Sequence, residues 1–555
     1  MPGSQSSPWN LGASSLTVGN TSTGTLQIGA GGAVSDGSGF IGRQAGSTGS
    51  VTVSGIGAQW TNSSGLSVGF SGTGTLGISN GGHVTSTTNT YVGVGASGTG
   101  TVTVSGPGSQ LNSTGFLRVG QTGNGTLQIS DRAVVTNGLA YVGYDPAGVG
   151  AVTVSGVGSQ WNSSAALTVG FSGNGKLDIA NGGAVSSTLG AIGAGANSTG
   201  AVTVDGTGSS WTNSSTLTVG NSGSGALTIS NNAVVSAVSA RAGVAAGSQG
   251  VINIGAAASA AAAAPGALTL TGPGPALTLG ATGALVFNHT NTSGYVFAPG
   301  ITGAGRLSTY SGATVLTANN DYTGGTTIAG GSLQLGNGGA SGAIVGNVAN
   351  NGSLIFNRSD TVTFAGLVSG SGAVNQNGAG ATILTANNTY TGGTAISAGT
   401  LQLGNGGATG AIVGNVANNG ALAFNRSDAM TFAGQISGAG SVSQIGAGAT
   451  VLTGNNTYTG GTTISAGTLQ LGNGGASGAI VGNVANDGTL AFNRSDVQTF
   501  AGQISGSGVV SQAGAGATIL TADNTYTGGT TISAGTLQLG NGGATGAIVG
   551  NVAND

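Results

Sequence analysis

Internal repetition is the feature that most constrains how this chain can fold. In its first part, "LTVG" or a close variant recurs every 50 or 51 residues, starting at Leu16, Leu66, Leu117, Leu167 and Leu217. "VTVSG" or "VTVDG" recurs with the same spacing, at Val51, Val102, Val152 and Val202. A fixed period of a few tens of residues is typical of units that stack on one another rather than of a single globular core.

The second part of the chain has a different period. "LTxxNxxYTGG" recurs every 68 residues and supplies Tyr322, Tyr390, Tyr458 and Tyr526. "FNRSD" follows the same period, at Phe356, Phe424 and Phe492. The 50-residue unit divides into two halves of similar layout, as in "LSVGFSGTGTLGISNGGHV" and "YVGVGASGTGTVTVSGPGSQL". The elementary unit is therefore about 25 residues, and dividing 68 by three gives a similar unit of about 23.

The repeats have the pattern of β-strands. Val51 and Val53 alternate with Thr52 and Ser54, so that apolar side chains share one face of an extended segment. The chain has 117 glycines, and only 4% of its residues are charged. All 12 acidic residues are aspartate and Lys176 is the one lysine. Two of the best surface helix formers are thus almost missing, which favours strands and turns.

Three architectures can accommodate such repeats. A propeller blade fits the 50-residue period, but a closed ring cannot continue into the 68-residue array. Tandem β-sandwiches need longer units. We therefore predict an all-β fold, a right-handed parallel β-helix (β-solenoid) of roughly 23 coils. Ile464, Leu469 and Leu471 are expected to face its core, and Thr462 and Gln470 to face outward. Copies of the repeated segment that contains these residues are expected to lie three coils, or ~14 Å, apart along the axis.

The sequence suggests three regions. Residues 1–235 are expected to form an array of 50-residue repeats with two coils each. Residues 236–283 form an Ala/Gly-rich junction, in which Ala256 to Pro265 is either a short helix ended by the proline or an irregular segment. Residues 284–555 are expected to hold 68-residue repeats of three coils each, with the last copy truncated.

Composition argues against several functions. The net charge is −3 without a basic stripe, so nucleic acid is not an expected partner. No apolar run is long enough for a membrane-spanning helix, and residues 1–15 lack the features of a signal peptide. The chain has no cysteine, which excludes disulfides, thiolate ligands and cysteine nucleophiles. His83 and His289 are far apart and are each expected to be solvated, so we predict no catalytic, cofactor-binding or metal-binding residue.

Four groups of polar or aromatic residues stand out in the sequence. The "FNRSD" pairs are expected to stabilise turns rather than to form a row of ligand contacts; they are Arg358 with Asp360, Arg426 with Asp428, and Arg494 with Asp496. Lys176, Asp178 and Asp205 come nearest to the acid–base cluster of a polysaccharide lyase. Recurrent aromatic residues are expected to pack rather than to stack on glycans; they are Tyr91, Tyr141, Trp60, Trp161 and Trp211. Asn388, Asn456 and Asn524 are expected to bond backbone groups of turns.

The repeats resemble a known family. "NNTYTGGTTISAGTLQLGNGG", from Asn455 to Gly475, is similar to the autotransporter-associated β-strand repeat. "GTLxIxxGGxV" followed by "GTVTVSGxGSxW" resembles the repeat of type V secretion passengers and some sorting-signal proteins. Together these similarities cover most of residues 9–555. They imply a bacterial autotransporter passenger of the AIDA/pertactin-like adhesin class, a β-helical stalk whose C-terminal β-barrel is not in this chain.

The resemblance and the scarcity of catalytic groups together suggest a function. The chain is expected to be a non-enzymatic adhesive passenger at the surface of a Gram-negative bacterium, attached to the outer membrane. It would bind a host or bacterial surface, through protein or glycan, or associate with itself, by multivalent contacts along the rod. The alternatives are a passive spacer that presents a head domain encoded elsewhere and, less favoured, a β-helix polysaccharide lyase.

Overall fold

The computed structural model describes residues 5–555, and all of its regular elements are β-strands, numbered β1 to β62. The strands pair in parallel and form a β-solenoid of about 23 coils, as predicted, where one coil is one full circuit of the chain. The described residues contain no helix of the length and apolarity needed to cross a membrane. The chain comprises two compact units. Unit 1 extends to Tyr295 and includes Pro299–Gly312 and Asp321–Gly324; unit 2 holds Val296–Ala298, Ala313–Asn320 and Gly325–Asp555.

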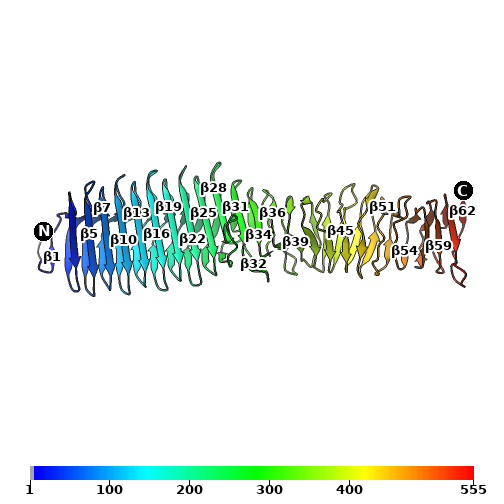
Figure 1. Cartoon of the computed structure of the whole chain (residues 1–555), viewed down its shortest axis with the longest axis horizontal. Coiled ribbons are helices and arrows are strands. Elements are labelled where there is room, and N and C mark those ends of the chain that lie inside the picture. The colour runs from blue at the N-terminus through cyan, green and yellow to red at the C-terminus, as the bar shows by residue number, and fades with distance from the viewer. Residues whose placement is uncertain (1–4) are drawn as a thin grey trace. The chain divides into compact units, whose positions relative to one another are not determined.

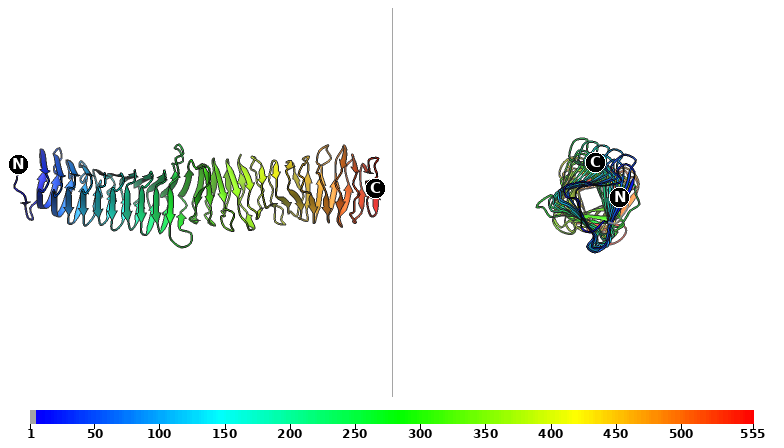
Figure 2. Two further views of the ribbon diagram at one scale, coloured as in Figure 1. Left: turned by 90° about the horizontal axis from the view of Figure 1, so that it is seen from below. Right: turned by 90° about the vertical axis from the view of Figure 1, so that its left-hand side faces the viewer.

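Most coils of unit 1 contribute three strands, and each strand pairs with its equivalent in the next coil (Figures 1 and 2). One strand of every coil stacks in a first sheet: β3 (Thr23–Ile28), β5 (Thr48–Ser54), β7 (Thr73–Ser79), β10 (Thr99–Ser105), β13 (Asn124–Ser130), β16 (Val149–Ser155), β19 (Asn174–Ala180), β22 (Thr199–Asp205), β25 (Ser224–Ser230), β28 (Gln249–Gly255), β31 (Gly283–Asn288) and β34 (Arg306–Ser311). The other two strands of a coil, such as β8 (His83–Ser86) and β9 (Asn89–Val92), belong to a second sheet, in which β4 (Ala33–Ile41) and β6 (Gln59–Val68) each span both positions.

Strict register builds the core of unit 1. Leu76 pairs with Val102, which pairs with Leu127, and all three side chains are fully buried. The 25-residue period thus places like residues directly above one another, one strand spacing of about 4.8 Å apart. Stacked apolar side chains bury the inner face of every coil, which stabilises neighbouring coils together rather than each one alone.

Glycine is required where consecutive coils approach most closely. Gly93 has a φ of 72°, and a Cβ atom built on it would lie 2.2 Å from the carbonyl oxygen of Asn124 in the next coil. The same geometry recurs at the "VG" marker of other coils, including Gly69 and Gly120. The glycine of this marker is therefore fixed by backbone conformation and by lack of space.

The segment from Ala256 to Pro265 is irregular, so the helix alternative is wrong. It leaves β28 and returns to the stack at β29 (Ala267–Leu270) without a helical turn. Asn288 stabilises this segment by donating hydrogen bonds from Nδ2 to the carbonyl oxygens of Ala257 and Ala260, at 2.8 and 2.9 Å. Alanine favours helix, but a segment this short gains too few helical hydrogen bonds to outweigh the pairing of the strands on either side.

Unit 2 is built from shorter coils. Paired residues on one of its sheets are 19 to 22 positions apart, as in Ala313 with Ser332 and Thr394 with Val416. Eight strands form this sheet, of which β32 (Tyr295–Phe297) is the first along the chain and β49 (Ile436–Ser437) the last. A second eight-stranded sheet begins at β40 (Val362–Phe364) and ends at β57 (Ile504–Ser505), and a seven-stranded sheet begins at β48 (Met430–Phe432) and ends at β62 (Val552–Asn554).

The 68-residue repeat does not contain a whole number of these coils. From Thr394 to Gly461 the chain contributes eight strands, β44 to β51, and two isolated bridge positions at Ala411 and Asn455. One coil uses three such positions, so these ten make three and one-third coils. Equivalent strands of successive repeats accordingly lie in different sheets: β44 (Thr394–Ile396), β52 (Thr462–Ile464) and β60 (Thr530–Ile532).

The expectation of three coils per repeat is therefore wrong, because the coils of unit 2 are shorter than 68 divided by three. Copies of the repeated phrase do not pair with one another, as expected: β52 pairs with β50 (Ser441–Gln444) and β54 (Val484–Asn486). Each copy is instead rotated by a third of a turn about the axis of unit 2 and lies ~16 Å beyond the previous one.

The core residues of the repeated phrase are confirmed, with one exception. Ile464, Leu469 and Leu471 are fully buried, and Gln470 lies on the outward side of its strand. Thr462 was expected to face outward but is buried, because its hydroxyl lies 2.6 Å from the hydroxyl of buried Tyr458. Thr463 takes the outward position. A buried phenol needs a hydrogen-bond partner, and this requirement decides which threonine faces inward.

Asp36 is an acid buried inside unit 1. It accepts a hydrogen bond of 3.2 Å from Nε1 of Trp60, while its Oδ1 has no partner. Burial raises the pKa of Asp36 to about 6, although the Trp60 hydrogen bond lowers it. Four coils later, the amide oxygen of Asn137 accepts the equivalent bond from Trp161 at 2.7 Å. An asparagine can thus occupy this environment without a charge.

The buried carboxyl predicts that the surrounding coils weaken as the pH rises. Between its unfolded pKa near 4 and its folded pKa of about 6, the folded state binds the proton more tightly, so stability falls as pH increases. Asp36→Asn should remove this dependence and stabilise β4 (Ala33–Ile41) and β6 (Gln59–Val68) by ~1–3 kcal/mol at pH 7.5. Hydrogen exchange of these strands measures the effect; an unchanged pH dependence in the variant would contradict it.

Candidate functional site

The recurrent tryptophans belong to the core. Trp60, Trp161 and Trp211 are fully buried, and their Nε1 groups donate to Asp36, Asn137 and Ser187. The expectation that they pack rather than stack on glycans is confirmed for these three residues. Their partners sit on the coil before each tryptophan, so each indole joins two coils.

Tyr91 and Tyr141, in contrast, lie on the outer face of unit 1. They belong to β9 and β15 (Ala140–Val142), the strands on either side of β12 (Leu117–Val119). Arg118 of β12 pairs in register with both tyrosines. All three side chains are half-buried, while the residues on either side of them in each strand point into the core. Three consecutive coils thus place a tyrosine, an arginine and a tyrosine next to one another on the surface.

Further rings complete what we call the Arg118 cluster: Tyr91, Phe116, Arg118, Tyr141, Tyr144 and Phe171. The guanidinium carbon of Arg118 lies 3.6 Å from the ring centre of Tyr144 and 4.3 Å from that of Phe116. The rings of Tyr144 and Phe171 stack with centres 4.9 Å apart, and Tyr141 meets both edge-on. Each cation–π contact contributes ~0.5–1 kcal/mol at such a surface, so the cluster holds the arginine in place.

Arg118 keeps most of its hydrogen-bonding capacity. Among the described residues no carboxylate forms an ion pair with it, and its Nε has no partner. The nearest acid in sequence to the cluster is Asp145, which accepts a hydrogen bond of 2.7 Å from the Thr122 hydroxyl. The cluster therefore presents a fixed positive charge, and the structure shows no hydrogen bond from its guanidinium to any of residues 5–555.

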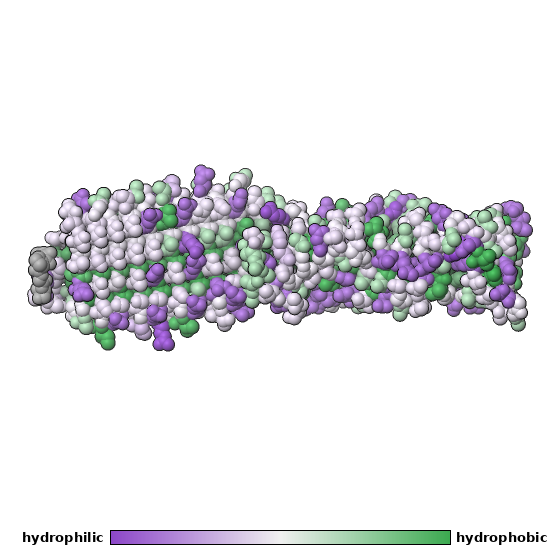
Figure 3. Space-filling view, viewed as in Figure 1, coloured by the Kyte–Doolittle hydropathy of each residue, from purple (hydrophilic) through white to green (hydrophobic). Residues whose placement is uncertain are grey.

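A smaller group of the same chemistry lies on the same sheet face. Phe40 occupies the outward position three strands before Arg118, since Phe40 pairs with Ser67 and Ser67 with Tyr91. Its ring meets that of Phe70 edge-on at 5.6 Å, and the guanidinium of Arg43 lies 4.9 Å from its centre. Phe70 and Phe171 are 38% and 37% exposed. Figure 3 shows that strongly hydrophilic residues are sparse on the face of unit 1 drawn there, which otherwise displays lanes of apolar and weakly polar residues.

Sequence reasoning singled out the two tyrosines but missed the other members of these groups. A signal was present: the second residue of the "LTVG" marker is threonine at Thr17, Thr168 and Thr218, whereas it is Arg118 in one marker and Phe40, Tyr91 and Tyr141 at the equivalent position of the other half-repeat. The sequence shows that this position faces outward only once the pairing register of its strand with neighbouring strands is known. The turn residues Phe116, Tyr144 and Phe171 have no fixed place in the repeat pattern that would reveal their contacts.

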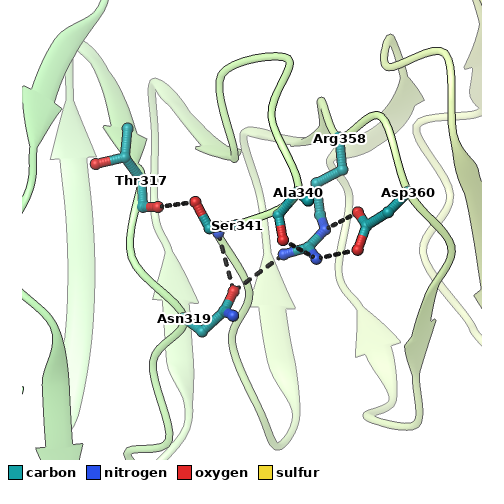
Figure 4. A network of polar contacts seen from close by, with 7 residues as sticks. Thr317, Asn319, Ala340, Ser341, Arg358 and Asp360 are labelled. Carbon is teal, nitrogen blue, oxygen red and sulfur yellow. Dashed lines mark hydrogen bonds and ion pairs between the residues drawn. The ribbon is translucent and has the colours of Figure 1, made fainter.

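The "FNRSD" motif is a structural clamp in unit 2 (Figure 4). Arg358 donates from Nε and Nη2 to both oxygens of Asp360, at 2.9 and 2.7 Å. It also donates to the carbonyl oxygen of Ala340 at 2.7 Å and to Oδ1 of Asn319 at 3.0 Å. The arginine is buried while the aspartate is partly exposed. One guanidinium thereby connects segments 18 and 39 residues away, which belong to earlier coils.

The clamps do not form a row of ligand contacts. Each follows a strand in a different sheet: β39 (Ser353–Phe356), β47 (Ala421–Phe424) and β55 (Thr489–Phe492). Bonding to Arg358, Arg426 and Arg494 lowers the pKa of Asp360, Asp428 and Asp496, respectively. The expectation that these pairs stabilise turns is confirmed, but the arginines are buried rather than solvated.

The asparagines of the second array also bond backbone groups, as expected. Asn456 accepts from the amide of Ile436 at 2.9 Å and donates to the carbonyl oxygens of Gly454 and Ala479, each at 2.9 Å. Asn388 and Asn524 make the same set of contacts. Each amide therefore joins three consecutive coils without forming a ladder with its own copies.

The remaining polar candidates are engaged locally. Lys176 pairs with Asp178 at 2.8 Å on the surface, and Asp205 accepts from Ser230 and Asn231 at 2.5 and 2.7 Å. His83 lies at the surface with Nε2 3.1 Å from the carbonyl oxygen of Gly108. His289 is fully buried beside Tyr295, so the expectation that it is solvated is wrong, and burial lowers its pKa. Residues 5–555 contain no group of three His, Asp or Glu side chains placed to hold a metal ion.

The clamp predicts a local loss of stability when its arginine is removed. Arg426→Ala deletes the bonds to Asp428, to the Ala408 carbonyl oxygen and to Asn387, and should destabilise the loop from Gly404 to Gly410 by ~1–3 kcal/mol. Hydrogen exchange of that loop measures this change. Lys176→Ala is the matched control, because its ion pair has the same two-residue spacing but is exposed; it should change local stability by less than ~0.5 kcal/mol. Equal effects of both substitutions would contradict the clamp.

Comparison with known proteins finds a repeat family that matches the second array. A family described as passenger-associated-transport-repeat matches residues 309–335, 374–403, 442–471 and 510–539. The third of these segments runs from β50 to the end of β53 (Thr468–Leu471) and includes Tyr458 and Thr462. The matched residues are thus those that turn the chain and fill the core of unit 2.

One relative is the adhesin BmaC autotransporter of Brucella suis biovar 1 (strain 1330). It is 37% identical over 151 residues, a match that covers 23% of this chain and 4% of that protein. The chain therefore spans only a small part of the length of this relative. The four repeat segments and this similarity support an autotransporter-type passenger with repeats, and with it a location at the cell surface, attached to the outer membrane.

Proposed function

We propose that this chain is an adhesive, non-enzymatic stalk segment that mediates attachment to a surface or aggregation between cells. The observation that carries the proposal is the alignment of equivalent residues from coil to coil in unit 1. Its period of about 25 residues equals one coil, so outward positions align in lanes, and one lane carries Phe40, Tyr91, Arg118 and Tyr141. Weak contacts repeated along one face add up through effective concentration.

The similarity to an adhesin supports this proposal, and the low charge of the chain fits it. Only 4% of the residues are charged, so two chains repel each other weakly when their faces approach. The expected partners are a host or bacterial surface, through protein or glycan, or a second copy of the chain. The passenger's own β-barrel remains an expected partner from its family.

A passive spacer is the main alternative, and unit 2 is the better candidate for that role. Because its repeats rotate by a third of a turn, a flat target meets equivalent side chains only after three repeats. A lyase is less favoured, since Lys176, Asp178 and Asp205 are each engaged in local contacts.

Two deletions that preserve register separate adhesion from spacing. Residues 89–138 form one 50-residue repeat and include the Arg118 position, whereas residues 394–461 form one 68-residue repeat. We expect the first deletion to abolish most clumping or surface binding of a non-aggregating bacterium that displays the chain on a barrel. The second deletion should leave most of it.

The control is the barrel displayed alone, with surface amounts matched for all variants. Equal effects of the two deletions would support the spacer. Binding and clumping by the intact chain no greater than those of the barrel alone would refute adhesion by this segment.

A further inference from the structure

The outer face of unit 1 carries a lane of aromatic rings and arginines that spans several coils. We define the aromatic lane as Phe40, Arg43, Phe70, Tyr91, Phe116, Arg118, Tyr141, Tyr144 and Phe171. From Phe40 to the ladder position of Thr168, five strand spacings correspond to ~24 Å along the stack. We propose that this lane binds an acidic polysaccharide, carrying carboxylate or sulfate groups, that runs along the stacking direction.

Charge defines the ligand as an anion. Arg118 is held by four rings at 3.6 to 5.8 Å, and among the described residues neither Arg118 nor Arg43 has an ion pair. A guanidinium offers paired N–H donors that match a carboxylate or a sulfate. Because the rings already fix Arg118, little side-chain entropy is lost when an anion binds.

The shape of the lane favours a polysaccharide over a peptide or nucleic acid. The lane is the face of a sheet whose strands are already paired on both sides, so an extended peptide finds no free backbone edge there. A nucleic acid needs many basic residues to neutralise its phosphates, and the lane has two. Sugar rings need only ring faces, hydroxyl partners and an occasional cation, and all of these recur along the lane.

The chain supplies matched variants for a test. Threonine occupies the outward ladder position in other coils, at Thr168 and Thr218, so Arg118→Thr and Tyr141→Thr substitute a residue this position accepts. Arg241 lies on the same ladder, next to Thr218, and is exposed. No ring packs against it among the contacts of the described chain. Arg241→Thr therefore removes the same charge from the same face outside the lane.

The inference rests on the proposed adhesive function, and the experiment uses the purified full chain. Biolayer interferometry would measure its binding to alginate, which carries carboxylates, to dextran sulfate, and to neutral dextran. We expect binding to at least one acidic polymer and none to dextran. Arg118→Thr should weaken binding at least about tenfold and Tyr141→Thr several-fold, while Arg241→Thr stays within about twofold of wild type. Equal melting curves would show that the variants are folded.

Three outcomes would overturn the inference. They are no binding to either acidic polymer, unchanged binding by Arg118→Thr, and an equal loss with Arg241→Thr, which would indicate only non-specific charge attraction. If displayed chains still clump or attach to a protein-coated surface while no polysaccharide binds, the adhesive function stands and a protein partner replaces the glycan. If display gives no adhesion but the purified chain binds alginate in an Arg118-dependent way, the binding site stands and the adhesive function falls.

Discussion

Parallel hydrogen bonding between one coil and the next is the constraint on which the rest of this structure depends. It forces each residue onto its register partner, so that Leu76, Val102 and Leu127 form one continuous buried column. It also explains the glycine of the "VG" marker, because Gly93 approaches the next coil too closely for any side chain. A charged inward residue is correspondingly costly, and the buried carboxyl of Asp36 has its pKa raised to about 6. Charge is therefore disfavoured at the inward positions of each coil, which contributes to its scarcity in the sequence.

The two units meet this constraint with coils of different length, and the surface differs as a result. In unit 1 the sequence period equals one coil, so an outward substitution such as Arg118 finds its neighbours Tyr91 and Tyr141 directly alongside. In unit 2 the repeat spans three and one-third coils, so each copy of the Arg–Asp clamp belongs to another sheet. Straight lanes suit contact with one extended ligand. Rotating copies distribute identical stabilising contacts evenly around the stack.

Much of the fold could be predicted from the sequence, because alternation and period report directly on strands and coils. The buried positions of Ile464, Leu469 and Leu471 followed from alternation alone. Thr462 did not, since its inward orientation depends on the phenol of Tyr458, four residues away. The coil length of unit 2 was also missed, because a 68-residue period fixes only the sum of its coils. The Arg118 cluster depends on contacts between four coils, which no single repeat displays.

The rotation of the 68-residue repeats can be tested directly, since the cysteine-free chain allows cysteines to be introduced one pair at a time. Ala417 and Ser437 are register partners on adjacent strands, β46 (Val416–Asn418) and β49 (Ile436–Ser437), and both point outward. Neighbouring strands lie about 4.8 Å apart, within the range a disulfide spans. The measurement is the yield of intramolecular disulfide on mild oxidation of the double variant Ala417→Cys/Ser437→Cys, compared with Asn415→Cys/Ser437→Cys. The structure predicts a high yield for the first pair and a low one for the second. The reverse result would mean that coils of equal length fill the repeat, and it would contradict the rotation of its copies.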